Sequence, residues 1–196
     1  MMQLHRPFES LRDVQGPLRQ IAMWLLACLT IGYSTGLLFV ANTTGITPAG
    51  IEGRYRGNQD AVDAKREPGT SIDEAVSIEP QEHDDQELQF EKSYEEMLNI
   101  THTHILSMAS FFALVAVVFA YASRPSRRMK MLLIVEPFVA IIVSFFAMWL
   151  MRYVDPAFSY LLMISSGSMA FCFYAMVLMS MRELVARRQF PVPSID

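Results

Sequence analysis

The most regular pattern along the chain is an alternation of long apolar runs with polar, charged connections. Apolar residues gather at 21–41, 105–122, 131–151 and 158–181. A helix rises about 1.5 Å per residue, so about 20 residues cross a hydrocarbon core roughly 30 Å thick. The second run is slightly short, and we extend it to 101–122. Backbone amides cannot remain unpaired in lipid, so each run predicts a transmembrane helix.

These runs predict an all-α membrane protein, a four-helix transmembrane bundle with an acidic extracytoplasmic segment between its first and second helices. Composition agrees, because 52% of the residues are hydrophobic and the mean hydropathy is +0.25. The first run is longer than the apolar core of a signal peptide. Cleavage after Ala41 would also place Phe39 where a small residue is needed, so we expect a retained anchor.

Basic residues predict which side of the membrane each connection faces. By the positive-inside rule, segments 1–20, 123–130 and 182–196 are cytoplasmic, and segments 42–100 and 152–157 lie on the opposite side. Both termini are therefore expected in the cytoplasm. The ten cations that set this orientation are Arg6, Arg12, Arg19, Arg124, Arg127, Arg128, Lys130, Arg182, Arg187 and Arg188.

The segment 42–100 contains fourteen Asp and Glu against five Lys and Arg, a net charge of −9. Its first part, 42–57, is rich in Gly and Thr, which predicts ordered turns on the membrane surface. Residues 58–91 are polar and acidic with few aromatics, and we expect them to be mobile. Residues 93–100 begin the second transmembrane helix.

A capping box marks that helix start. Ser93 and Glu96 have the S-x-x-E spacing in which each side chain bonds the other residue's backbone amide. The helix is therefore predicted to start near Tyr94 and to run without a break to Ala122.

The segments TTGITPAGIEGRYRG (43–57) and KSYEEMLNITHTHILSM (92–108) resemble small uncharacterised four-helix inner-membrane proteins of bacteria. The resemblance implies a multi-pass protein of a bacterial inner (plasma) membrane. It implies no reaction, cofactor or partner.

Two histidines near this helix start are candidate metal ligands. His102 and His104, with Glu95 and Glu52, offer imidazole and carboxylate groups that suit zinc or copper. Residues two apart on a helix point about 160° apart, so one metal would need further ligands from the outer segment or a neighbouring subunit. Otherwise one histidine faces headgroups and the other bonds the nearby turn. Haem held by two histidines is not expected, because the other three spans contain no histidine.

Glu136 is the one acidic residue well inside a span, six residues beyond Lys130. Pro137 follows it and removes a helical hydrogen bond, which concentrates polar groups at this point. One interpretation is a proton or ligand site with Tyr174 as partner. The other is a structural carboxyl bonded to Tyr174 or Ser180.

Two patches of small residues predict close helix packing. Gly32 and Gly36 lie in the first span, and Ser165, Ser166, Gly167 and Ser168 lie in the fourth. We expect the two helices to touch there. A homodimer formed through Gly32 and Gly36 is the alternative.

The leading hypothesis for function is a non-catalytic accessory, assembly or scaffold subunit of a larger inner-membrane complex. The sequence contains no Walker loop, G-x-G-x-x-G, H-E-x-x-H or G-x-S-x-G, so we identify no catalytic residues and do not expect a familiar enzyme. Expected partners are the lipid bilayer and a membrane protein or second copy, with no nucleic acid. The first alternative is a redox or metal-handling protein using His102 and His104. The second is a small proton-coupled channel or transporter centred on Glu136.

Overall fold

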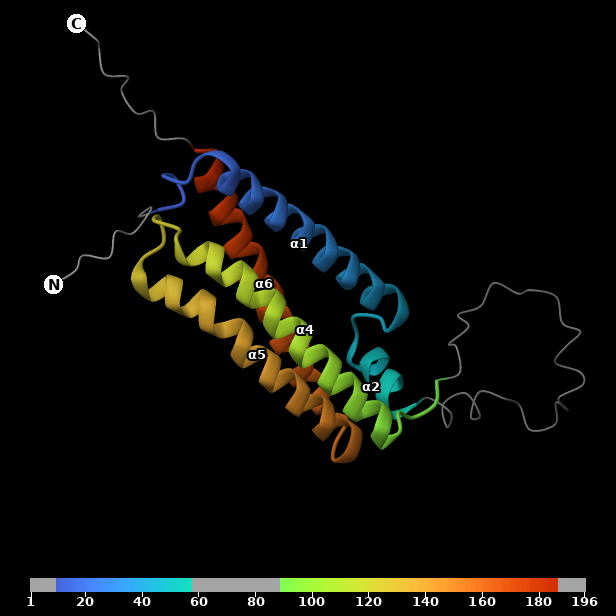
Figure 1. Ribbon diagram of the computed structural model, residues 1–196. Helices are drawn as coiled ribbons and strands as arrows, with labels where there is room; N and C mark the ends of the chain where they lie inside the picture. Colours follow the sequence, from blue (N-terminus) through green and yellow to red (C-terminus); the bar gives the residue numbers. More distant parts are fainter. Residues whose placement is uncertain (1–9, 58–88, 187–196) are drawn as a thin grey trace, which may run out of the picture.

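The computed structural model describes residues 10–57 and 89–186, which form five α-helices and no strand (Figure 1). We expected residues 58–91 to be mobile, and 58–88 of that segment lie outside the described residues. The helices are α1 (Gly16–Thr43), α2 (Pro48–Arg56), α4 (Tyr94–Ala120), α5 (Arg127–Tyr153) and α6 (Phe158–Val185).

Four of these helices have the length and composition of membrane spans. α1, α4, α5 and α6 contain 27 or 28 residues each, which corresponds to about 40 Å of helix. Large apolar side chains cover their outward faces: Ile142, Ile164 and Phe171 are 69%, 70% and 71% exposed. Such surfaces are stable in contact with lipid tails. The predicted all-α, multi-pass membrane fold is confirmed.

Local sequence signals account for the helix starts. Ser93 and Glu96 form the predicted capping box, with Glu96 accepting from the Ser93 amide at 2.8 Å and Ser93 accepting from the Glu96 amide at 3.2 Å. Ser126 caps α5 by accepting from the amide of Met129 at 3.3 Å. The first turn of α1 contains Pro17, whose fixed φ suits that position.

The expectation of turns over 42–57 was wrong for the greater part of that segment, because Pro48–Arg56 is the helix α2. Thr47 is its N-cap and accepts from the amide of Gly50 at 3.2 Å, and Pro48 occupies the first turn. Gly57 ends the helix with φ +85°. We predicted turns from the Gly and Thr content and did not recognise the N-cap Thr47 and the terminating Gly57 as the start and stop signals of a helix.

The bundle has two chemically different ends. At one, which we call the terminal end, the start of α1, the α4–α5 connection and the end of α6 meet (Figure 1). There the amide of Leu11 donates to the carbonyl of Tyr121 at 3.0 Å, and Arg19 Nε donates to the carbonyl of Leu184 at 2.8 Å. The other, the α2 end, holds α2, the start of α4 and the α5–α6 connection.

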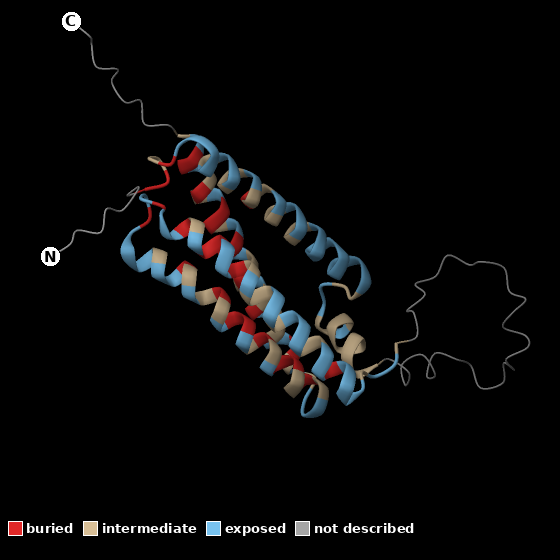
Figure 2. Cartoon of the chain, in the orientation of Figure 1, coloured by how far each residue is buried: buried red, intermediate tan, exposed pale blue. Residues whose placement is uncertain are grey.

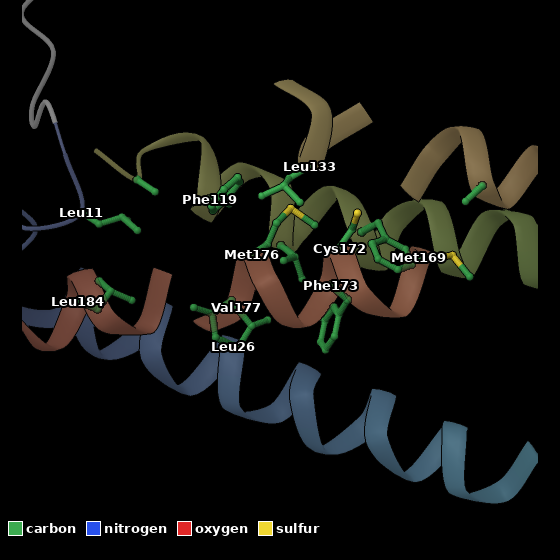
Figure 3. Packing of buried hydrophobic residues seen from close by; sticks show 14 of the residues in the cluster. Leu11, Leu26, Phe119, Leu133, Met169, Cys172, Phe173, Met176, Val177 and Leu184 are labelled. Carbon is green, nitrogen blue, oxygen red and sulfur yellow. The ribbon is translucent and has the colours of Figure 1, made fainter. Parts of the chain in front are cut away.

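The core lies among α4, α5 and α6, and α1 packs against its outside. Buried positions are frequent along α5 and α6 and sparse along α1 (Figure 2). Phe119, Leu133 and Met176 fill the space among the three inner helices (Figure 3). Leu26 is the one buried residue of α1, and it lies beside Val177 of α6. α1 is therefore the peripheral helix of the bundle.

Candidate functional site

The structure brings the two residues that flank the acidic segment 58–88 together at the α2 end. A Cβ atom added to Gly57 would lie 2.9 Å from both the carbonyl oxygen of Gln89 and the amide nitrogen of Glu91. One residue further, the amide of Lys92 donates to the carbonyl of Tyr55 at 2.9 Å. The segment therefore leaves and rejoins the described part of the chain at one place.

Two arginines fix this junction to the ends of the membrane helices. Arg56 Nη1 donates to the carbonyl of Met151 at 3.2 Å, which fastens α2 to α5. Arg152 Nε donates to the carbonyl of Lys92 at 3.0 Å, and its Nη2 lies 3.2 Å from a carboxylate oxygen of Glu91. We call the set Tyr55, Arg56, Gly57, Lys92 and Arg152 the loop anchor.

The surroundings of the loop anchor are aromatic. Trp149 Nε1 donates to Thr101 Oγ1 at 2.9 Å, and the indole stacks on Tyr153 at 5.5 Å between ring centroids. The guanidinium of Arg152 lies 4.9 Å from the centroid of the Tyr153 ring. Burial raises the pKa of Tyr55, with the charge of Arg54 acting in the opposite direction. These contacts make the α2 end an amphipathic surface of the kind found at membrane–water boundaries.

The structure does not gather the predicted metal ligands. His102, His104 and Glu95 are exposed on α4, and Glu52 instead pairs with Arg56 at 3.7 Å. Across residues 10–57 and 89–186, no three His, Cys, Asp or Glu side chains are close enough to hold one ion. The two histidines point apart because they lie two residues apart on one helix.

A second polar site lies between α5 and α6, within the membrane. Ser168 Oγ donates to Glu136 Oε1, and Ser144 and Ser165 are hydrogen-bonded at 2.7 Å. Pro137 is accommodated inside α5, which continues through it. Glu136 Oε2 is buried and has no hydrogen-bond partner among the described residues. Polar pairs of this type hold membrane helices together.

The expected partners of Glu136 were wrong. Tyr174 is hydrogen-bonded to Ser34 of α1 at 2.8 Å, and Ser180 makes no hydrogen bond with a described residue. Ser168 and Tyr174 are six residues apart, so their side chains point about 120° apart around α6. Matching residues by depth alone did not account for this rotation.

The two small-residue patches do not form the expected contact with each other. A Cβ atom added to Gly32, Gly36 or Gly167 would meet nothing within 4 Å. Ser165 and Ser168 face α5 instead of α1. The Tyr33 ring of α1 packs on the ring of Phe173, and Ser34 is hydrogen-bonded to Tyr174. These larger side chains hold α1 at a distance from α6 at which the glycines do not touch it.

Sequence reasoning missed a buried carboxylate at the terminal end. Glu183 is fully buried on α6, and its two oxygens accept from the amide and hydroxyl of Ser123 and from the amide of Arg124, at 2.6–3.0 Å. It fixes the α4–α5 connection to the end of α6. Its signal in the sequence is a lone acidic residue beside Arg182 in an otherwise basic stretch.

The comparisons with curated proteins and with solved structures gave no match. A family model described as a transmembrane helical domain, Aq_1264_TM, matches residues 45–190. The matched region contains α2, α4, α5 and α6 and begins after α1, the helix that packs on the outside of the core. The chain thus belongs to the Aq_1264_TM transmembrane helical domain family.

Proposed function

We propose that the protein is a non-catalytic subunit of a larger complex in a bacterial inner membrane, where it presents the acidic segment 58–88 to a basic partner protein. The observation that carries this proposal is the loop anchor. Its contacts hold both ends of a segment with ten Asp and Glu and two Lys and Arg at one place above the membrane helices. Dense negative charge attracts and orients a basic surface.

The proposed orientation follows from the distribution of cations. Exposed arginines surround the terminal end, and acidic residues dominate the sequence beyond the α2 end. The positive-inside rule then places the terminal end in the cytoplasm and the α2 end in the periplasm. The partner would meet the protein on the periplasmic side.

α1 offers a second contact surface in the membrane. Around Gly32 and Gly36 its outer half is exposed, and small residues allow another helix to approach closely. A partner helix or the α1 of a second copy would pack there. This surface complements the periplasmic contact.

Site-specific photocrosslinking in intact cells tests the proposal. A photoreactive amino acid at Gln81, in the acidic segment, is expected to give a discrete protein adduct, and one at the exposed Ile142 is the control. Replacing the Asp and Glu of 58–88 with Asn and Gln should abolish the adduct, whereas the same residues in shuffled order should retain it. An adduct that persists without the charges, or none at Gln81, would refute the proposal.

A second candidate function rests on Glu136. One of its oxygens is buried and makes no hydrogen bond with a described residue, and a carboxyl group in that state can hold a proton inside the membrane. Reconstitution in proteoliposomes tests this role. Proton flux that is lost with Glu136→Gln supports it, and flux equal to that of empty vesicles removes it.

A further inference from the structure

Three arginines of the terminal end lie just before or at the start of α5. Arg124, Arg127 and Arg128 are exposed, and none forms an ion pair with a carboxylate within 10–57 or 89–186. Lys130 Nζ donates to the carbonyl of Ala120 at 3.0 Å. The described part of the chain therefore supplies these three arginines with no counter-charge.

The carboxylate of Glu183 does not fill that role. It is buried, and it accepts four hydrogen bonds from Ser123 and from the backbone of Arg124. These bonds fix the start of the α4–α5 connection to α6 and leave the Arg124 side chain exposed. Glu183 is thus a positioning residue for the backbone of Arg124.

The first turn of α5 adds backbone donors to the same place. Ser126 satisfies two of its amides, accepting from Met129 at its hydroxyl and from Lys130 at its carbonyl. The amides of Arg127 and Arg128 have no acceptor within the helix, as is general for a helix start. The positive end of the helix dipole favours an anion there.

The length of α5 gives the depth of this cluster in the membrane. α5 has 27 residues and is about 40 Å long, which matches a bilayer with its headgroup layers. Its first residue, Arg127, therefore lies at the level of lipid phosphates. We propose that Arg124, Arg127, Arg128 and the start of α5 bind the phosphate headgroup of an anionic phospholipid.

Native mass spectrometry of the full-length protein in mild detergent tests this site. The probes are phosphatidylglycerol, phosphatidylcholine and inorganic phosphate. We expect phosphatidylglycerol to bind most tightly and to lose about fivefold in affinity for each arginine replaced by Gln, since a cation near a membrane surface contributes about 1 kcal/mol. Arg54→Gln removes a cation at the α2 end and should change nothing.

Glu183→Gln separates this proposal from simple charge attraction. Removing an anion should tighten the binding of an anionic lipid, but loss of the positioning contacts should weaken it. We expect at least a threefold weakening, with far-UV circular dichroism confirming the fold. Ser123→Ala, which removes one of the four hydrogen bonds, is the milder variant if Glu183→Gln does not fold.

Three results would overturn the assignment. Equal affinity for phosphatidylglycerol and phosphatidylcholine would show that the headgroup charge is not recognised. Inorganic phosphate binding as tightly as phosphatidylglycerol would identify a free anion as the ligand. Equal losses with Arg127→Gln and Arg54→Gln would place the binding elsewhere.

Discussion

At the scale of single residues, the α2 end depends on close backbone approach. Gly57 has φ +85°, a conformation that other residues adopt at a cost, and its missing side chain leaves room for the backbone of Gln89 and Glu91. Gly32 lies in a regular helix with open space around it. The two glycines therefore differ in what they contribute to stability.

We predict that Gly57→Ala destabilises the protein by about 1–3 kcal/mol, from left-handed backbone strain and from contacts at 2.9 Å. Gly32→Ala should not destabilise it, because alanine favours a helix and meets no neighbour there. The measurement is the free energy of unfolding in mixed detergent micelles. Equal effects of the two substitutions would show that Gly57 does not join the ends of the acidic segment.

For Glu136 we predict a coupling of about 0.6–2 kcal/mol with Ser168, the range found for hydrogen bonds between membrane helices. A double-mutant cycle of Glu136→Ala and Ser168→Ala measures it. Glu136→Gln keeps an acceptor oxygen and should retain most of the stability. Additive single effects would contradict the Ser168 pairing.

The sequence located Glu136 in the membrane but did not identify its partner. Depth along a helix can be counted from residue numbers, whereas rotation about the axis depends on which faces pack together. Glu183 was missed for the same reason, since its partners lie sixty residues away in the α4–α5 connection. Local signals such as the Ser93–Glu96 box need no tertiary information and were predicted correctly.

At the scale of elements, α1 differs from the other spans. It has one buried residue, Leu26, and the family match begins after it. The three inner helices contain the polar pairs of the α5–α6 contact and most of the core. α1 therefore packs on the outside of the other three spans.

We predict that Leu26→Ala lowers the free energy of unfolding by about 2 kcal/mol or more, because it leaves a cavity between α1 and α6. Leu38 is 63% exposed on the same helix, and Leu38→Ala should have an effect below about 0.5 kcal/mol. Thermal unfolding of the two variants in the same detergent makes the comparison. Similar losses would mean that α1 does not pack through Leu26.

The apolar runs predicted the four long helices because a bilayer imposes length and composition directly on sequence. α2 was not predicted, since nine residues with two glycines favour turns when taken alone. Its position against the ends of α5 and α6, fixed in part by Arg56, is a tertiary effect. Short helices outside the membrane are not held to the length and apolar composition that a bilayer requires, so they are harder to predict from sequence.

At the scale of the whole molecule, the two ends of the bundle carry opposite chemistry. The terminal end exposes arginines on a backbone fixed by Glu183, and the α2 end holds both ends of a strongly acidic segment. The membrane separates the two.

Cysteine labelling in intact cells tests this arrangement most directly. In a background with Cys28 and Cys172 replaced by Ala, single cysteines are introduced at Thr70, in the acidic segment, and at Ser194, near the C-terminus. We predict that a membrane-impermeant maleimide labels Thr70→Cys in intact cells and Ser194→Cys only after permeabilisation. Labelling of Ser194→Cys in intact cells, with Thr70→Cys protected, would contradict it.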